Sequence, residues 1–206
     1  MMMLSTYITG LTLMATLIMP IGMQNAFVLN QGIKRQHHLF VAAFCSIADV
    51  FFMSIGVWGG AKLFTTYPWL LMGIGILGAI FMAYYGFLCF KSAFKGGNTL
   101  TTDTKTRSFK AIVFACCAFT ILNPHVYIDT IVILGGFAAN LTAEQRPWFV
   151  FGGVSASFLW FFSLALLGQK LAPILSKPKS QQVIDLVIGT MMWILALYLL
   201  RYVFIN

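Results

Sequence analysis

Residues 123–130 read NPHVYIDT and lie between two long apolar runs. A charged side chain at the centre of a membrane helix costs about 2.5–3.5 kcal/mol on insertion scales, so residues of this kind mark substrate or proton paths. The chain has only 5 acidic residues, yet Asp129 in this stretch and Asp49 upstream both interrupt apolar sequence. These two carboxylates are therefore the first candidates for a functional role.

The composition predicts an integral membrane protein. The 206 residues are 60% hydrophobic and only 9% charged, which is far from the usual composition of soluble domains. The formal net charge is +8, but the basic residues cluster between apolar segments, so topology explains them and we expect no nucleic-acid partner. The 4 cysteines form no C-x-x-C pair and no metal-ligand spacing, and we expect neither a metal site nor a cofactor.

The apolar segments predict an all-α fold with six transmembrane helices in a single transporter domain, 1–206. A helix that crosses the bilayer needs about 20 apolar residues. The segments that qualify are roughly 4–28, 39–61, 69–90, 111–139, 148–168 and 183–205. The basic loop 91–110 is expected to link two halves, roughly 1–95 and 105–206, on the cytoplasmic side.

The distribution of basic residues predicts the orientation. Cytoplasmic loops carry an excess of Lys and Arg, and ten of the 13 basic residues lie in the first, third and fifth connections. Both termini are therefore predicted to be periplasmic if all six segments span the membrane. If the first segment only dips into the bilayer, the N-terminus is cytoplasmic instead.

Segments one and four share a proline followed by polar groups. Pro20 precedes Gln24 and Asn25, and Pro124 precedes Asp129. Proline frees a backbone carbonyl one turn earlier, and a freed carbonyl in a bilayer needs protein, water or substrate as a partner. Matching breaks in two three-helix halves predict an inverted-repeat transporter with its substrate site near mid-membrane. The alternative is that both prolines only kink their helices.

The candidate substrate and proton site gathers around these breaks. The predicted site residues are Asp49, Asp129, Gln24, Asn25, Asn123 and His125, with helix breaks at Pro20, Gly22 and Pro124. The apolar segments that carry the two acids hold no Lys or Arg close to them, so a proton or a cationic substrate is the expected counter-ion. A proton and a cation would compete for one carboxylate, which is a simple basis for exchange.

Alternatives remain for individual residues. Either acid could instead be a protonated group bonded to a neighbouring helix, and His125 could relay protons, contact substrate or make only a local hydrogen bond. Asp185 is interpreted as a helix-start residue favoured by the helix dipole.

These stretches also carry a resemblance. MPIGMQNAFV at 19–28, NQGIKRQ at 30–36 and LNPHVYIDT at 122–130, with SASFLWFF at 155–162, resemble the LysE family of bacterial basic-amino-acid exporters, most closely its arginine-exporter branch. Met23 departs from the second proline that is more frequent in the family. The resemblance implies that Asp49 and Asp129 both serve transport, that the protein lies in the bacterial inner membrane, and that it exports arginine or lysine using a proton or ion gradient.

Charge balance favours antiport. Moving the net positive charge of arginine outward against an inside-negative potential costs about 2.3 kcal/mol per 100 mV, and an inbound proton would cancel it. The expected partners are arginine or lysine, protons or another coupling ion, and membrane lipid, with a homo-oligomer left open. A divalent-metal or other cation exporter is one alternative, although only His125 could join the acids as a ligand. A membrane-embedded enzyme that pairs Ser155 or Ser157 with His125 is the other.

Overall fold

The computed structural model describes residues 2–20, 22–60, 62, 66–94, 108–175 and 177–205, and every regular element in these ranges is a helix. The elements are α1 (Met2–Ile18), α2 (Met23–Lys34), α3 (His38–Ile55), η1 (Gly56–Gly60), α5 (Pro68–Phe94), α6 (Phe109–Ile121), α7 (Pro124–Val126), η2 (Tyr127–Ile133), α8 (Leu134–Ala138), α9 (Arg146–Leu175) and α10 (Pro178–Ile205). Most of the predicted loop 91–110 lies outside the described residues. The protein is thus an all-helical, multi-pass membrane protein.

Four stretches of the described chain are long and apolar enough to cross a membrane by themselves. They are His38–Gly60, Met72–Phe94, Arg146–Leu175 and Pro178–Arg201. α1 and α2 make a fifth crossing if they are counted as one span, although their axes differ by 81°. α6 and Tyr127–Ala138 are shorter apolar helices, so six complete crossings stay a prediction.

Both predicted helix breaks are present. α1 ends at Ile18 and α2 begins at Met23, with the extended Gly22 (φ −104°) as its N-cap. α6 ends at Ile121, and a new helix begins at Pro124 and continues as the π-helix η2. Proline cannot donate the backbone hydrogen bond that a continuous helix requires at these positions, which explains why each apolar segment is divided in two.

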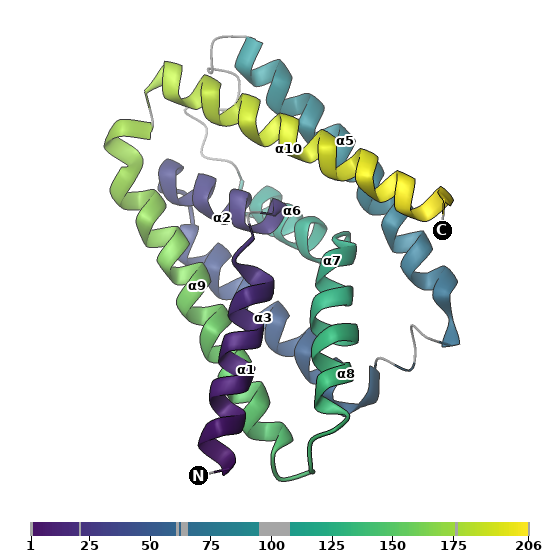
Figure 1. Ribbon diagram of the computed structural model, residues 1–206. Coiled ribbons are helices and arrows are strands. Elements are labelled where there is room, and N and C mark those ends of the chain that lie inside the picture. Colours follow the sequence, from purple (N-terminus) through teal and green to yellow (C-terminus); the bar gives the residue numbers. More distant parts are fainter. Residues whose placement is uncertain are drawn as a thin grey trace.

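The helices form two groups that meet at the breaks (Figure 1). α9 packs along α1, α2 and α3, whereas α5 and α10 pack chiefly against each other. Glycines allow the closest contact in the first group, because a Cβ added to Gly10 of α1 would lie 2.1 Å from the carbonyl oxygen of Phe149 in α9. The N-terminus lies at one end of the molecule and the α9–α10 turn at the other.

The interpretation of Asp185 as a helix-start residue is wrong. α10 begins at Pro178, and Asp185 is only 1% exposed and accepts a 2.6 Å hydrogen bond from the Ser92 hydroxyl of α5. Hydropathy missed the first turns of α10 because they are polar, although proline is well suited to the first position of a helix. Asp185 therefore helps to join α10 to α5.

Candidate functional site

The two helix breaks border one cavity of about 380 Å³. Its walls come from α1, α2, α3, α5, η2, α9, α10 and the residues around the second break. All of the predicted polar site residues line it: Gln24, Asn25, Asp49, Asn123, His125 and Asp129, together with the break residues Pro20 and Gly22. Pro124 lies between two of these lining residues in the chain. The tertiary structure thus brings the whole candidate set together.

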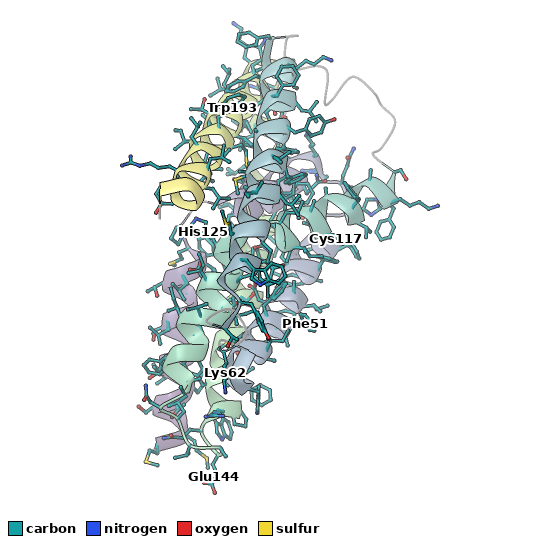
Figure 2. All side chains as sticks on the ribbon, turned by 90° about the vertical axis from the view of Figure 1, so that its right-hand side faces the viewer. Phe51, Lys62, Cys117, His125, Glu144 and Trp193 are labelled. Atoms are coloured by element: carbon teal, nitrogen blue, oxygen red, sulfur yellow. The ribbon has the colours of Figure 1, made fainter. Side chains whose placement is uncertain are left out.

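The cavity has exposed and buried lining residues. Thr16, Pro20 and His125 are exposed, so they mark its open side. Gln24 and Asp49 are buried and form part of its inner wall. Figure 2 places His125 between Trp193 near one end of the molecule and Lys62 towards the other. Because His125 lines the cavity, the cavity lies away from both ends of the molecule.

Asp49 is held from a second helix. It is 3% exposed on α3, and its Oδ2 accepts a 2.6 Å hydrogen bond from the Ser157 hydroxyl of α9, which is completely buried. Asp49 therefore lines the cavity while Ser157 orients it. The enzyme alternative needs Ser157 as a nucleophile with His125 as its base, whereas the Ser157 hydroxyl donates to Asp49.

Asp129 reaches the cavity from an irregular helix. It lies in η2, where the Leu134 amide donates to the Asp129 carbonyl in the wide π-helical pattern. Single π-helical turns are rare in proteins, but those that occur are often found at functional sites. η2 packs closely on the first residue of η1, which directly follows α3: a Cβ added to Gly56 would lie 2.5 Å from the Thr130 carbonyl oxygen. Gly56 thus allows the two elements that carry Asp49 and Asp129 to approach each other.

Asn25 closes the first break. Its amide nitrogen donates to the carbonyl oxygens of Ile18 at 2.6 Å and Pro20 at 2.8 Å, and its own oxygen accepts from Trp160 Nε1 at 3.2 Å. These bonds supply the partners that carbonyls freed in a bilayer require. Asn25 is therefore a structural residue of the break, and its contact with a substrate stays a prediction. The role of Trp160 was missed because its partner is far away in the sequence.

The second break is closed differently. The Tyr127 hydroxyl donates to the Ile121 carbonyl at 2.8 Å, and the Asn123 side chain accepts from the His125 amide at 3.2 Å. These bonds leave the His125 ring on the exposed side of the cavity.

Gln24 extends the polar wall towards α6. Its amide donates to the Thr120 hydroxyl at 3.4 Å. In the part of the chain that the structure describes, no group of three or more His, Cys, Asp or Glu residues could hold a metal ion.

A pair of acids that line a cavity where two membrane helices break is the arrangement of a membrane transporter. A sequence profile of the LysE type translocator family matches residues 15–203. The chain belongs to this family.

Similar proteins agree with this assignment. The chain is 45% identical over 200 residues to the arginine exporter protein ArgO of Shigella flexneri and to that of Escherichia coli, covering 97% of this chain and 95% of each relative. It is 44% identical to ArgO of Yersinia enterocolitica, covering 97% of this chain and 98% of the relative. No solved structure matches the chain.

Proposed function

We propose that the protein exports arginine, with lysine as the alternative substrate, from the cytoplasm across the bacterial inner membrane. Asp49 and Asp129 are the groups that the substrate cation and the proton share in this proposal. The observation that carries it is that both carboxylates line one cavity whose described lining residues include no Lys or Arg. The near full-length similarity to curated arginine exporters supports the substrate.

The cavity suits an amino acid with a cationic side chain. Its volume of about 380 Å³ lies within the usual range for small-molecule sites. A guanidinium offers five N–H donors in a planar fork, and carboxylates accept them in short, strong hydrogen bonds. The α-carboxylate of the substrate would lie at the start of α2, where backbone amides have no acceptor inside the helix and the dipole favours negative charge.

The transport cycle is proposed as antiport between two inverted halves, roughly 1–95 and 105–206. Export of arginine alone would move positive charge outward, at a cost of about 2.3 kcal/mol per 100 mV. If a proton binds to the same carboxylates when the cation is released, and then moves inward, the two charge movements cancel. The breaks at Pro20 and Pro124 border one cavity, as expected if they are equivalent elements of two repeats. In this proposal all six segments span the membrane, the loops after α2, α5 and α9 are cytoplasmic and both termini are periplasmic, which the excess of basic residues in those loops supports.

Counterflow of labelled arginine in vesicles tests the proposal. Asp129→Asn and Asp49→Asn keep the size of each side chain and remove its charge, so both variants should lose exchange of arginine while remaining folded. Lysine should compete with arginine, whereas citrulline, which is nearly isosteric but uncharged, should not. Unchanged exchange in Asp129→Asn, or equal competition by citrulline, would show that carboxylates do not recognise the substrate.

A further inference from the structure

α2 carries two further polar residues beyond the cavity. Asn30 and Gln31 follow the cavity-lining residues Met23 and Gln24 by seven residues each, so they lie on the same faces of α2 two turns further on. At a rise of 1.5 Å per residue, this places them about 10 Å along the helix axis. They lie towards the end of α2 at Lys34, which the orientation proposed above places on the cytoplasmic side.

Both side chains are buried without a partner for their oxygen atoms. Asn30 is 3% and Gln31 2% exposed. In the described part of the chain, neither Asn30 Oδ1 nor Gln31 Oε1 accepts a hydrogen bond. A buried acceptor without a donor is unfavourable, and an apolar side chain of similar size would be tolerated better. An acceptor that serves a passing ligand would explain why these positions are polar.

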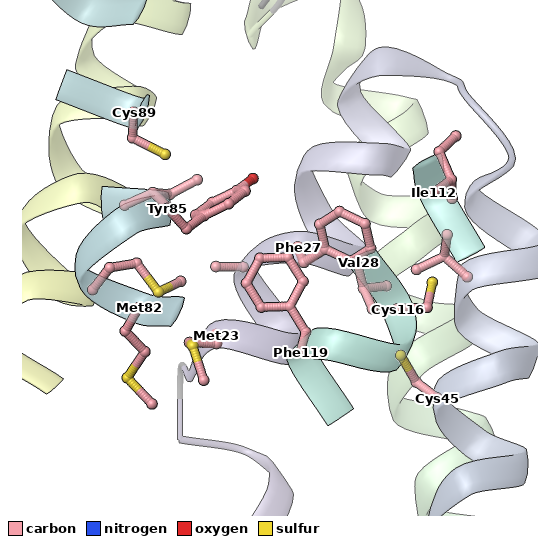
Figure 3. Close-up of a cluster of buried hydrophobic side chains, with 14 of the residues drawn as sticks. Met23, Phe27, Val28, Cys45, Met82, Tyr85, Cys89, Ile112, Cys116 and Phe119 are labelled. Atoms are coloured by element: carbon pink, nitrogen blue, oxygen red, sulfur yellow. The ribbon is translucent and has the colours of Figure 1, made fainter. Parts of the chain in front are cut away.

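Aromatic side chains pack at the level of α2 that lies between these amides and the cavity-lining residues Met23 and Gln24. Phe27 lies between the two levels of α2, and its ring centroid is 4.7 Å from that of Phe119 in α6. Tyr85 of α5 stacks edge-on against Phe119 at 4.8 Å. Figure 3 shows the Phe27 and Phe119 rings side by side, with Tyr85 and Met82 facing them from α5. Phe27 and Phe119 are almost completely buried.

We propose that Asn30 and Gln31 form a second binding site, on the cytoplasmic side of the Phe27–Phe119 barrier, for the guanidinium or ammonium group of the substrate. This inference rests on the proposed function and adds a site to it. Amide oxygens accept N–H donors but carry no full charge, so they hold a cation less tightly than Asp49 and Asp129 do. The substrate binds first to the amides and reaches the carboxylates when Phe27 and Phe119 separate.

The test compares arginine transport from each membrane face in everted and right-side-out vesicles. The double variant Asn30→Leu, Gln31→Leu should raise half-saturating arginine at the cytoplasmic face about tenfold, corresponding to one lost hydrogen bond to a charged group. The maximal rate and half-saturation at the periplasmic face should change little. Thermal stability in detergent should not fall, because the replacements remove two buried oxygen atoms that accept no hydrogen bond in the described part of the chain. The matched control is Gln36→Leu, an amide beyond the end of α2 that is only partly buried.

Each outcome decides between defined alternatives. Unchanged half-saturation at the cytoplasmic face would overturn the second site, and a simultaneous fall in thermal stability would identify the amides as structural only. An equal loss at both faces would assign Asn30 and Gln31 to the first site. If the unaltered protein exchanges no arginine at all, the proposed function fails, which is distinguishable from the failure of the second site alone.

A second variant tests the barrier by itself. Phe119→Ala should let labelled arginine leak through the vesicles without a counter-substrate, whereas Ile112→Ala, in the same helix and equally buried, should not. If Phe119→Ala vesicles remain as tight as those with the unaltered protein, the barrier is placed elsewhere and the two-level path is refuted.

Discussion

Removal of the Ser157 hydroxyl would test one hydrogen bond of the candidate site, the bond from Ser157 to Asp49. Ser157→Ala deletes the single oxygen that donates to Asp49 Oδ2 at 2.6 Å, and both residues are buried. The substitution adds no volume, and alanine is an excellent helix former at this position of α9. Any effect on transport would therefore come from the carboxylate that loses its donor.

The magnitude follows from the kind of hydrogen bond. A hydrogen bond to a charged group contributes about 1.5–3 kcal/mol, which corresponds to a factor of about 10–150 in an equilibrium constant. The bond stabilises the ionised Asp49 that attracts a cation. Half-saturating arginine should therefore rise by this factor in Ser157→Ala, while a protonated Asp49 would be affected less because it is uncharged.

The assay is labelled arginine counterflow over a range of substrate concentrations, with protein amount and thermal stability measured on the same preparation. Ser155→Ala is the matched control, because Ser155 lies on the same helix and donates only to the Phe151 carbonyl at 2.8 Å. Equal half-saturation in the two variants would refute the role of Ser157 in orienting Asp49. A loss of transport in Ser155→Ala would show that the effect arises from α9 and not from the hydrogen bond.

Further predictions concern packing and the first break. Asn25→Ala removes both hydrogen bonds to the freed carbonyls and should lower stability by about 1–3 kcal/mol, measured by thermal unfolding in detergent. Trp160→Phe removes only one donor to Asn25 and should lower stability less. A larger loss in Trp160→Phe than in Asn25→Ala would contradict the role of Asn25 in closing the break. Gly135→Ala should destabilise the protein strongly, because its Cβ would lie 2.6 Å from the Gly56 carbonyl oxygen. A Cβ added by Gly136→Ala meets nothing within 4 Å, so this variant should stabilise α8 by up to about 1 kcal/mol. Equal unfolding temperatures for Gly135→Ala and Gly136→Ala would exclude close packing of Gly135 against Gly56.

Much of the site could be predicted because its signals are local. A proline inside an apolar run removes a backbone hydrogen bond of the helix, and both Pro20 and Pro124 lie at breaks in the structure, although Pro173 lies inside the continuous α9. An acid inside such a run is costly wherever the run crosses the membrane, which directed attention to Asp49 and Asp129. Both residues line the cavity.

Other features could not be predicted because they depend on partners from other helices. Asp185 was assigned to a helix start from hydropathy, yet it bonds to Ser92, 93 residues away. Asn25 is predicted as a site residue and lines the cavity, but the hydrogen bonds of its amide to Ile18, Pro20 and Trp160 could not be predicted. Neighbours of this kind are set by helix packing, which a single sequence does not reveal.

The sequence by itself determined that the protein is helical and membrane-embedded, where its apolar segments lie, where two of them break and which residues carry charge in apolar surroundings. Only the tertiary structure decided that the breaks face one cavity, that Ser157 holds Asp49 across 108 residues of chain, and that the rings of Phe27 and Phe119 pack together from α2 and α6. Hydropathy and proline act within a few residues, whereas these contacts join distant segments. Their geometry arises only when the helices pack.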